Sequence, residues 1–333
     1  MKTCSKCVLD ERFPGIQFNE AGVCNFCFST KNIEEHSTTK NKSEAMFSRL
    51  ILEHRGKGSY DCLLAYSGGK DSTYTLHLLR KKYGLKLLAY SFDNWFQSET
   101  ARRNIMSVLK NVNVDHLTIT PSFETMRKII LASMSKDMHS QKALTRASSI
   151  CTSCISLIRF VGLRISIEQE IPFLVFGMSP GQAPLATAIV KVNAQMIRMT
   201  QNAFLKPVFK EMGDIIQSLL LEERHFKRPK KFPYSINPLS FTDYDEKEIL
   251  RIVQGYGWRK PDDTDANSTN CLLNAFANQV HMEQFGFNPY AYEIAGMVRL
   301  GDMTRQDGLT KLEQPLPHDQ IMEVKRKLGI GSS

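Results

Sequence analysis

Short apolar runs alternate with amphipathic stretches through the middle of the chain. Four runs predict buried strands, at residues 62–66, 87–92, 114–120 and 171–177. Between them, 72–83 and 98–109 carry apolar residues at helical spacing and predict helices that cover a sheet. Strands that alternate with helices favour parallel βαβ units. The expected fold class is therefore α/β, with a doubly wound parallel sheet.

The two flanks have a different pattern. Residues 1–30 are rich in cysteine and short of aliphatic residues, and the polar stretch 31–57 predicts a linker helix at 43–54. Residues 58–205 hold the alternating pattern, and 206–333 predict a mostly helical C-terminal region. The clearest helices there are expected at 211–223 and at 245–256, the second with Thr242 or Asp243 as its N-cap.

Composition adds bounds on size and surroundings. The length of 333 residues and the 42% share of hydrophobic residues are typical of a soluble protein of about two domains. A net charge of +9 suits anionic ligands without choosing among them. Apolar runs such as 171–178 are shorter than the roughly 20 residues that cross a bilayer, so no membrane segment is expected. We expect a cytoplasmic protein, whose eight cysteines point to metals and catalysis before disulfides.

The segment Ser67-Gly68-Gly69-Lys70-Asp71-Ser72, named the phosphate loop below, follows the first predicted strand and opens a helix. Its glycines let the backbone approach a ligand, and a helix N-terminus presents free N–H groups to an anion. Lys70 can neutralise phosphate charge and is a candidate catalytic residue. The spacing matches neither a Walker loop nor a dinucleotide fingerprint. The plain alternative is an ordinary glycine turn.

Residue for residue, the phosphate loop resembles the signature of the PP-loop ATP pyrophosphatases, the superfamily of asparagine synthetase, GMP synthetase and several tRNA thiolases. The resemblance covers about residues 58–200. It implies a HUP-like ATP-binding domain at 58–205 in which a substrate oxygen is adenylated and a nucleophile then displaces AMP. It also implies contacts to ATP and Mg²⁺ from Ser67, Gly68, Gly69, Asp71 and Ser72, with Lys70 nearby.

Two further strand ends are expected at the same site, because ligands of open α/β sheets bind outside the carboxyl ends of the strands. Asp93 follows the second strand, where the resemblance implies adenosine-binding groups. After the fourth strand, residues 177–182 resemble a second nucleotide-facing loop, which implies contacts from Gly177, Ser179, Gly181 and Gln182. This segment lacks the His and Asp that thiolases commonly carry there, and a tight turn is the alternative.

Two cysteine pairs near the N-terminus predict a metal site. Sixteen residues separate Cys4-x2-Cys7 from Cys24-x2-Cys27, which is the spacing of a four-thiolate zinc ribbon. Four thiolates leave no open position on Zn²⁺, so the expected role is structural or partner-docking. The segment 4–27 also resembles the N-terminus of N-acetyl-sugar amidotransferases of surface-polysaccharide biosynthesis.

Four cysteines remain. Cys62 lies in the first predicted strand and is expected to be packing. Cys151 and Cys154 open a predicted helix, whose dipole is expected to lower their thiol pKa, and Cys271 ends the polar stretch 262–271. The order resembles iron–sulfur-dependent tRNA thiolases, which implies a [4Fe–4S] cluster with one iron left open. The alternatives are a second structural knuckle, unbound thiols, or a persulfide on Cys151 or Cys154 that Cys271 resolves.

Together these features predict an ATP-dependent, AMP-forming transferase that replaces a carbonyl or amide oxygen with sulfur carried or coordinated by Cys151, Cys154 and Cys271. The expected cofactors are ATP, Mg²⁺, Zn²⁺ and [4Fe–4S]. One alternative is an amidotransferase of the N-acetyl-sugar type that takes ammonia from a partner glutaminase. Another is a noncatalytic RNA- or nucleotide-binding module that uses the ribbon and the basic run 224–232.

The expected partners follow from the cysteine pattern and the resemblances above. A small-molecule or carrier-bound substrate is expected rather than tRNA, because thiolases usually carry a second zinc module near the C-terminus and no cysteine follows Cys271. The further partner is a sulfur donor or a glutaminase, and a homodimer is left open.

Overall fold

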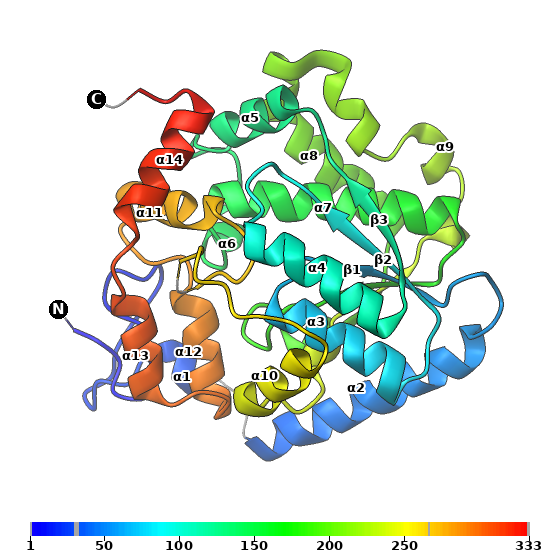
Figure 1. Ribbon diagram of the computed structural model, residues 1–333. Helices are drawn as coiled ribbons and strands as arrows, with labels where there is room; N and C mark the ends of the chain where they lie inside the picture. Colours follow the sequence, from blue (N-terminus) through cyan, green and yellow to red (C-terminus); the bar gives the residue numbers. More distant parts are fainter. Residues whose placement is uncertain (1, 30–32, 266, 332–333) are drawn as a thin grey trace.

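A six-stranded mixed sheet forms the centre of the protein (Figure 1). The computed structural model describes residues 2–29, 33–265 and 267–331, with side chains except at 33–34 and 207–215. The strands are β1 Cys62–Ala65, β2 Leu87–Phe92, β3 Asp115–Ile119, β4 Phe173–Phe176, β5 Ile189–Lys191 and β6 Tyr234–Ile236. Their order is β3-β2-β1-β4-β6-β5, and every neighbouring pair is parallel except β5 with β6. The predicted α/β class is confirmed, with β5 as an antiparallel addition at one edge.

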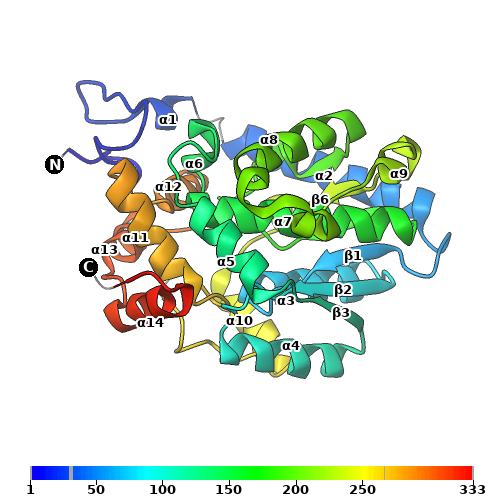
Figure 2. The same cartoon turned by 90° about the horizontal axis from the view of Figure 1, so that it is seen from above.

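Helices cover both faces of the sheet (Figure 2). The α-helices are α1 Asn25–Phe28, α2 Ile33–His54, α3 Lys70–His77, α4 Glu99–Val112, α5 Phe123–Ala132, α6 Gln141–Leu144, α7 Ser149–Glu168, α8 Ala194–Met212, α9 Glu223–Phe226, α10 Glu246–Gly255, α11 Leu273–Phe285, α12 Ala291–Leu300, α13 Arg305–Glu313 and α14 His318–Leu328. A π-helical turn, Leu78–Lys82, continues α3, and short 3₁₀ turns lie at Leu185–Thr187, Gly213–Leu219, Pro229–Lys231 and Pro238–Ser240.

Alternating side chains on the strands build two cores. Leu64 of β1 packs in a core shared with α2, α3, α4 and α10, whereas Leu63 packs in a core shared with α5, α7 and α8. Both side chains are fully buried. Burial on both faces explains why the strands read as continuous apolar runs instead of alternating ones.

Two helix predictions need correction. The helix expected at 211–223 is wrong, because α8 ends at Met212 and a 3₁₀ turn begins at Gly213, a residue type that weakens helix interiors. The N-cap expected at Thr242 or Asp243 is also wrong. The carboxylate of Asp245 caps α10 by accepting hydrogen bonds from the backbone N–H groups of Lys247 and Glu248.

Helix α7 is long and apolar enough, by length and composition, to cross a membrane. Core helices of soluble proteins meet the same criterion. Half of the apolar window is buried, and the helix contacts β1, β4 and α8. Leu157, Phe160 and Leu163 are fully buried in the core beneath it. Its apolar composition is thus explained by its place inside the fold.

The chain order places a switch point between β1 and β4. From β1 the chain runs outward to β2 and β3, and it then returns to place β4 on the other side of β1. Loops that leave the carboxyl ends of β1 and β4 therefore lie at the switch point, where open α/β sheets bind ligands in a crevice. The phosphate loop follows β1, and residues 177–182 follow β4.

Candidate functional site: a phosphate loop beside three thiols

The phosphate loop has the backbone geometry that its glycines predict. Gly68 adopts a φ of +75°, and a Cβ there would lie 2.7 Å from the carbonyl oxygen of Ala101. A side chain is therefore excluded both by conformation and by space. Gly69 is the N-cap of α3 and supplies no side chain to the first turn. The loop thus places the positive end of a helix dipole at the crevice.

Lys70 is buried and ion-paired. Its Nζ donates hydrogen bonds to Glu246 Oε1 at 2.6 Å and to the Tyr244 hydroxyl at 3.0 Å, and it lies 3.7 Å from Asp71 Oδ1. Burial opposes the charge on Lys70, but the carboxylates of Asp71 and Glu246 outweigh it and hold the Lys70 pKa above its usual value. Tyr244 also donates to Asp71 Oδ1 at 2.8 Å. Glu246 at the start of α10 and Tyr244 just before the N-cap therefore orient the two charged residues of the loop.

The loop 177–182 packs directly on the phosphate loop. A Cβ on Gly177 would lie 2.6 Å from Ser72 Cα, and one on Gly181 would lie 2.4 Å from the carbonyl oxygen of Glu293 in α12. Ser179 donates to Glu293 Oε1 at 2.6 Å. Gln182 Oε1 accepts the backbone N–H of Ser179 at 3.2 Å, so this side chain closes the turn.

Glu293 is a half-buried carboxyl that no motif in the sequence singles out. Burial, reinforced by the charge of Asp71, raises its pKa to about 7. Asp93, the residue expected near adenosine, accepts the backbone N–H of Trp95 at 2.8 Å and pairs with Arg102 at 3.0 Å. Its carboxylate therefore stabilises the turn after β2 and is shared with a neighbouring arginine.

The three later cysteines gather around two asparagine side chains. Asn94 Nδ2 lies 3.9 Å from Cys154 Sγ and 3.6 Å from Cys271 Sγ. The thiol of Cys151 donates to Asn274 Oδ1 at 3.7 Å. Segments separated by more than a hundred residues thus converge on one thiol cluster.

A polar network centred on Asn274 contacts the thiol cluster through Cys151. Asn274 Nδ2 donates to both carboxylate oxygens of Asp265, and Asn274 Oδ1 accepts the hydroxyl of Tyr290 at 2.9 Å. Burial raises the pKa of Cys151 to about 12 and also raises that of Cys154. The expected lowering by the dipole of α7 is therefore wrong for the metal-free thiols, because desolvation outweighs it.

One short segment joins the phosphate loop to the thiol cluster. Thr269 Oγ1 accepts the backbone N–H of Lys70 at 3.4 Å, and a Cβ on Gly69 would lie 2.7 Å from the same hydroxyl. Two residues further along the chain, Cys271, which carries one of the three thiols, forms a β-bridge with Gln97. The segment that contacts the phosphate loop therefore also carries one of the three thiols.

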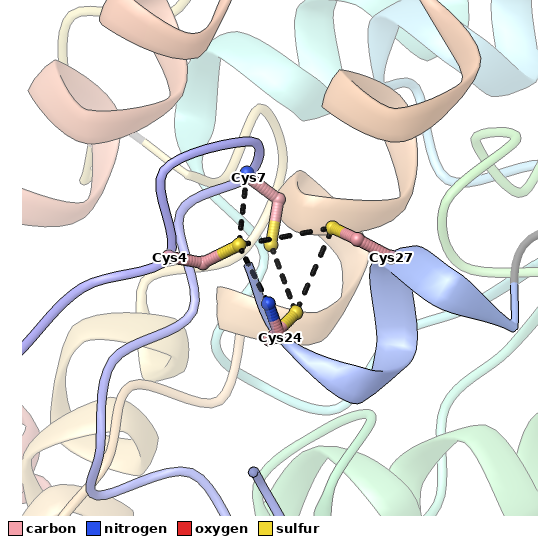
Figure 3. Close-up of side chains that lie close together, drawn as sticks. All are labelled: Cys4, Cys7, Cys24 and Cys27. Carbon is pink, nitrogen blue, oxygen red and sulfur yellow. Dashed lines mark hydrogen bonds between the residues drawn. The ribbon is translucent and has the colours of Figure 1, made fainter. Parts of the chain in front are cut away.

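The N-terminal cysteines converge as a zinc ribbon requires (Figure 3). The sulfur of Cys27 lies 3.8 Å from that of Cys4 and 3.6 Å from that of Cys24, and the sulfurs of Cys7 and Cys24 are 3.7 Å apart. A tetrahedron with Zn–S bonds of about 2.3 Å has edges of about 3.8 Å, so the donor set fits Zn²⁺. Backbone N–H groups of Lys6, Cys7 and Cys24 point at Cys4 Sγ and, against desolvation, lower the Cys4 pKa to about 6.

Within the described part of the chain, Cys151, Cys154 and Cys271 do not form such a compact group. Ligands of an iron–sulfur cube stand further apart than ligands of a single ion, so this wider arrangement is compatible with a cluster. Cys62 is fully buried in β1, which confirms its packing role. All eight cysteines are free of disulfides.

Much of the basic run 224–232 is neutralised by acidic residues. Arg228 and Lys231 each contact Glu170 at 2.6 Å. Arg224 contacts Glu168 at 3.0 Å, and the buried ring of His225 lies 3.0 Å from the same carboxylate. These pairs take up charge that an RNA backbone would otherwise contact.

No protein-family model matches the sequence. An uncharacterized protein of Methanocaldococcus jannaschii is 24% identical over 328 residues, which cover 98% of this chain and 99% of the relative. Among solved structures, the U34-tRNA thiolase NcsA from Methanococcus maripaludis with its [4Fe-4S] cluster is 18% identical, covers 100% of this chain and 99% of that chain, and has a TM-score of 0.36. NAD+ synthetase from Burkholderia pseudomallei is 14% identical, covers 68% of this chain and 88% of that chain, and has a TM-score of 0.23.

Proposed function

We propose that the protein is an ATP-dependent, AMP-forming sulfurtransferase of the PP-loop superfamily. The observation that carries the proposal is the segment that joins the two halves of the site. Thr269 meets the backbone of the phosphate loop, and Cys271 meets the amide of Asn94 that also faces Cys154. An activated acceptor bound at the phosphate loop would therefore lie beside the thiols.

The chemistry proceeds in two displacements. An acceptor oxygen attacks the α-phosphorus of ATP, the bond to the β-phosphate breaks, and pyrophosphate leaves. The loop amides would stabilise the charge that develops on that leaving group, and Asp71 would hold a Mg²⁺ ion that supplies further neutralising charge. Sulfur at the hydrosulfide level then attacks the adenylated carbon, and AMP leaves with the former acceptor oxygen. A persulfide donor would need one more thiol, which forms a disulfide as the C=S group is released.

Cys151, Cys154 and Cys271 would hold a [4Fe–4S] cluster, which when bound supplies an iron without a protein ligand at which sulfur can be held. The amide side chains of Asn94 and Asn274 would orient the thiols that hold it. Cys4, Cys7, Cys24 and Cys27 would hold a separate, structural Zn²⁺. Free thiols fit a reducing compartment, and we propose the cytoplasm.

Protein purified without oxygen tests the proposal. We expect iron and sulfide in stoichiometric amounts, zinc in addition, and release of pyrophosphate from ATP in the presence of acceptor. Cys271→Ala should lose iron and sulfur transfer while it keeps zinc and ATP binding. Absence of iron together with full turnover of Cys271→Ala would remove the sulfur reaction, and absence of ATP binding would remove the superfamily assignment.

The substrate class is tested with the same protein. We propose a small-molecule or carrier-bound acceptor, which the acidic partners of Arg224, Arg228 and Lys231 support. Affinity for tRNA that falls steeply with salt would contradict this choice. Product formation from ammonium in a variant without Cys151, Cys154 and Cys271 would identify amide-nitrogen transfer instead.

A further inference from the structure

Helix α12 lies between two parts of the protein. One is residues 4–27, which carry the four N-terminal cysteines and are called the cysteine module below, and the other is the loop 177–182 of the proposed nucleotide site. Along one face, Ala291, Ile294 and Ala295 are buried in a core that also contains the four cysteines of the module. These positions recur at the spacing of one helical face. Figures 1 and 2 both place α12 beside α1 of the cysteine module. The module therefore forms the support on which this face of α12 rests.

Aromatic contacts make this support specific. The ring of Phe13, which lies between the two cysteine pairs, is 5.3 Å from Phe287 and 5.9 Å from Tyr292. Phe26 meets Tyr292 edge to face at 6.0 Å. Such ring pairs stabilise a contact beyond the area they bury. The position of α12 thus depends on the fold of the cysteine module.

The opposite face of α12 meets the loop 177–182. Glu293 and Gly296 are three residues apart on this face, and both approach Gly181. The Glu293 carboxyl accepts the hydroxyl of Ser179 at 2.6 Å. Because that loop packs on Ser72 through Gly177, displacement of Glu293 would be transmitted to the phosphate loop.

We propose that the cysteine module is a support for the nucleotide site, which acts through α12 and uses Glu293 as the positioning residue for Ser179. The proposal rests on the proposed function, because it assumes that the crevice beside Ser179 binds ATP. It assigns the module a role inside its own chain and needs no docking partner. Arg305 strengthens the connection, since its guanidinium donates to the carbonyl oxygens of Cys4 and Cys7 from α13.

Titration calorimetry with Mg·ATP on the full chain tests the role of Glu293. Glu293→Ala should weaken binding by about tenfold, the effect of one buried hydrogen bond to a carboxyl. Glu293→Gln keeps an oxygen acceptor for Ser179 and should stay within about threefold of the unmodified protein. Glu283→Ala, an exposed position on α11, is the matched control and should bind normally.

A double-mutant cycle separates positioning from a direct role of the charge. Ser179→Ala and Glu293→Ala should not be additive, because each removes the same contact. A Gln variant as weak as the Ala variant would overturn positioning, because the negative charge would then be the required feature. Normal binding by Glu293→Ala would overturn it as well. Failure of the unmodified protein to bind ATP would instead remove the proposed function.

The support itself is tested at Phe13. Phe13→Ala should retain zinc, because the cysteines are intact, yet weaken Mg·ATP binding by about three- to tenfold. Phe28→Ala removes an exposed ring from the same module and should change neither quantity. If Phe13→Ala loses zinc, Tyr292→Leu provides the same test from the side of α12. A zinc-loaded variant at either position that binds ATP normally would overturn the support role.

Discussion

At the scale of single residues, His281 is a buried polar side chain whose desolvation no hydrogen bond among the described residues offsets. The side chain is 1% exposed and lies between the rings of Phe285 and Phe287. Neither ring nitrogen has a hydrogen-bond partner within the described residues. Burial lowers the His281 pKa from 6.5 to about 4. The folded protein therefore resists protonation of a group that the unfolded chain protonates readily.

This pKa difference predicts acid sensitivity. Since the unfolded state binds the proton more tightly, stability falls as the pH drops below about 6.5, and His281 contributes a loss of about 2 kcal/mol by about pH 5. His281→Leu should remove that share of the loss. The measurement is urea denaturation of both proteins at neutral and acidic pH, with exposed His318→Gln as the control. An unchanged pH dependence in His281→Leu would contradict the buried neutral ring.

At the scale of elements, the site depends on two loops that touch through backbone atoms. Gly177 follows β4, and a Cβ there would lie 2.6 Å from Ser72 Cα at the start of α3. Neither backbone can yield without displacing its strand or helix. The contact of β4 with the phosphate loop therefore selects glycine for space, even though the φ of Gly177 is not in the left-handed region.

Gly177→Ala should destabilise the fold by about 2–4 kcal/mol through overpacking. Gly255→Ala is the matched control, because no atom lies within 4 Å of its added Cβ and the residue ends α10. The control should be neutral or up to about 1 kcal/mol more stable, since alanine favours helix. Urea midpoints measure both effects. Equal midpoints for the two variants would show that the loops can separate freely.

At the scale of the whole molecule, the two ends of the chain form one body. Residues 4–27 share a core with α12, and Arg305 of α13 donates hydrogen bonds to the carbonyl oxygens of Cys4 and Cys7. A second core joins α11 and α14 to the start of α7. The C-terminal helices therefore connect the cysteine module to the sheet.

Removal of zinc should loosen this connection without unfolding the sheet. In Cys24→Ala, we expect amide hydrogen exchange in α12 and α13 to accelerate by at least about tenfold, because the metal contributes to the folding of the module beneath them. Strands β1 to β4 should stay protected. Exchange measured by mass spectrometry distinguishes the regions. Faster exchange confined to residues 2–29 would show that α12 is stable without the module.

Local patterns predicted much of the fold and part of the site. The strand, glycine turn and helix around the phosphate loop were readable because each signal lies within a few residues, and the two Cys-x2-Cys pairs were readable from spacing alone. The strands β5 and β6, three residues each, were missed because periodicity needs a longer run. Nothing in the sequence around Asn94 showed that its side chain faces Cys154 and Cys271.

The amino-acid sequence alone determined the chemistry that the chain carries: a backbone suited to phosphate, four thiolates at zinc spacing and three further cysteines. Tertiary structure decided which of these groups meet. Thr269 and Tyr244 reach the phosphate loop, and Glu293 reaches the loop 177–182, each across more than a hundred residues of chain. Such contacts depend on how helices pack against the sheet. The physical reason is range, because propensity and spacing act between neighbours along the chain, whereas burial and hydrogen bonding act between neighbours in space.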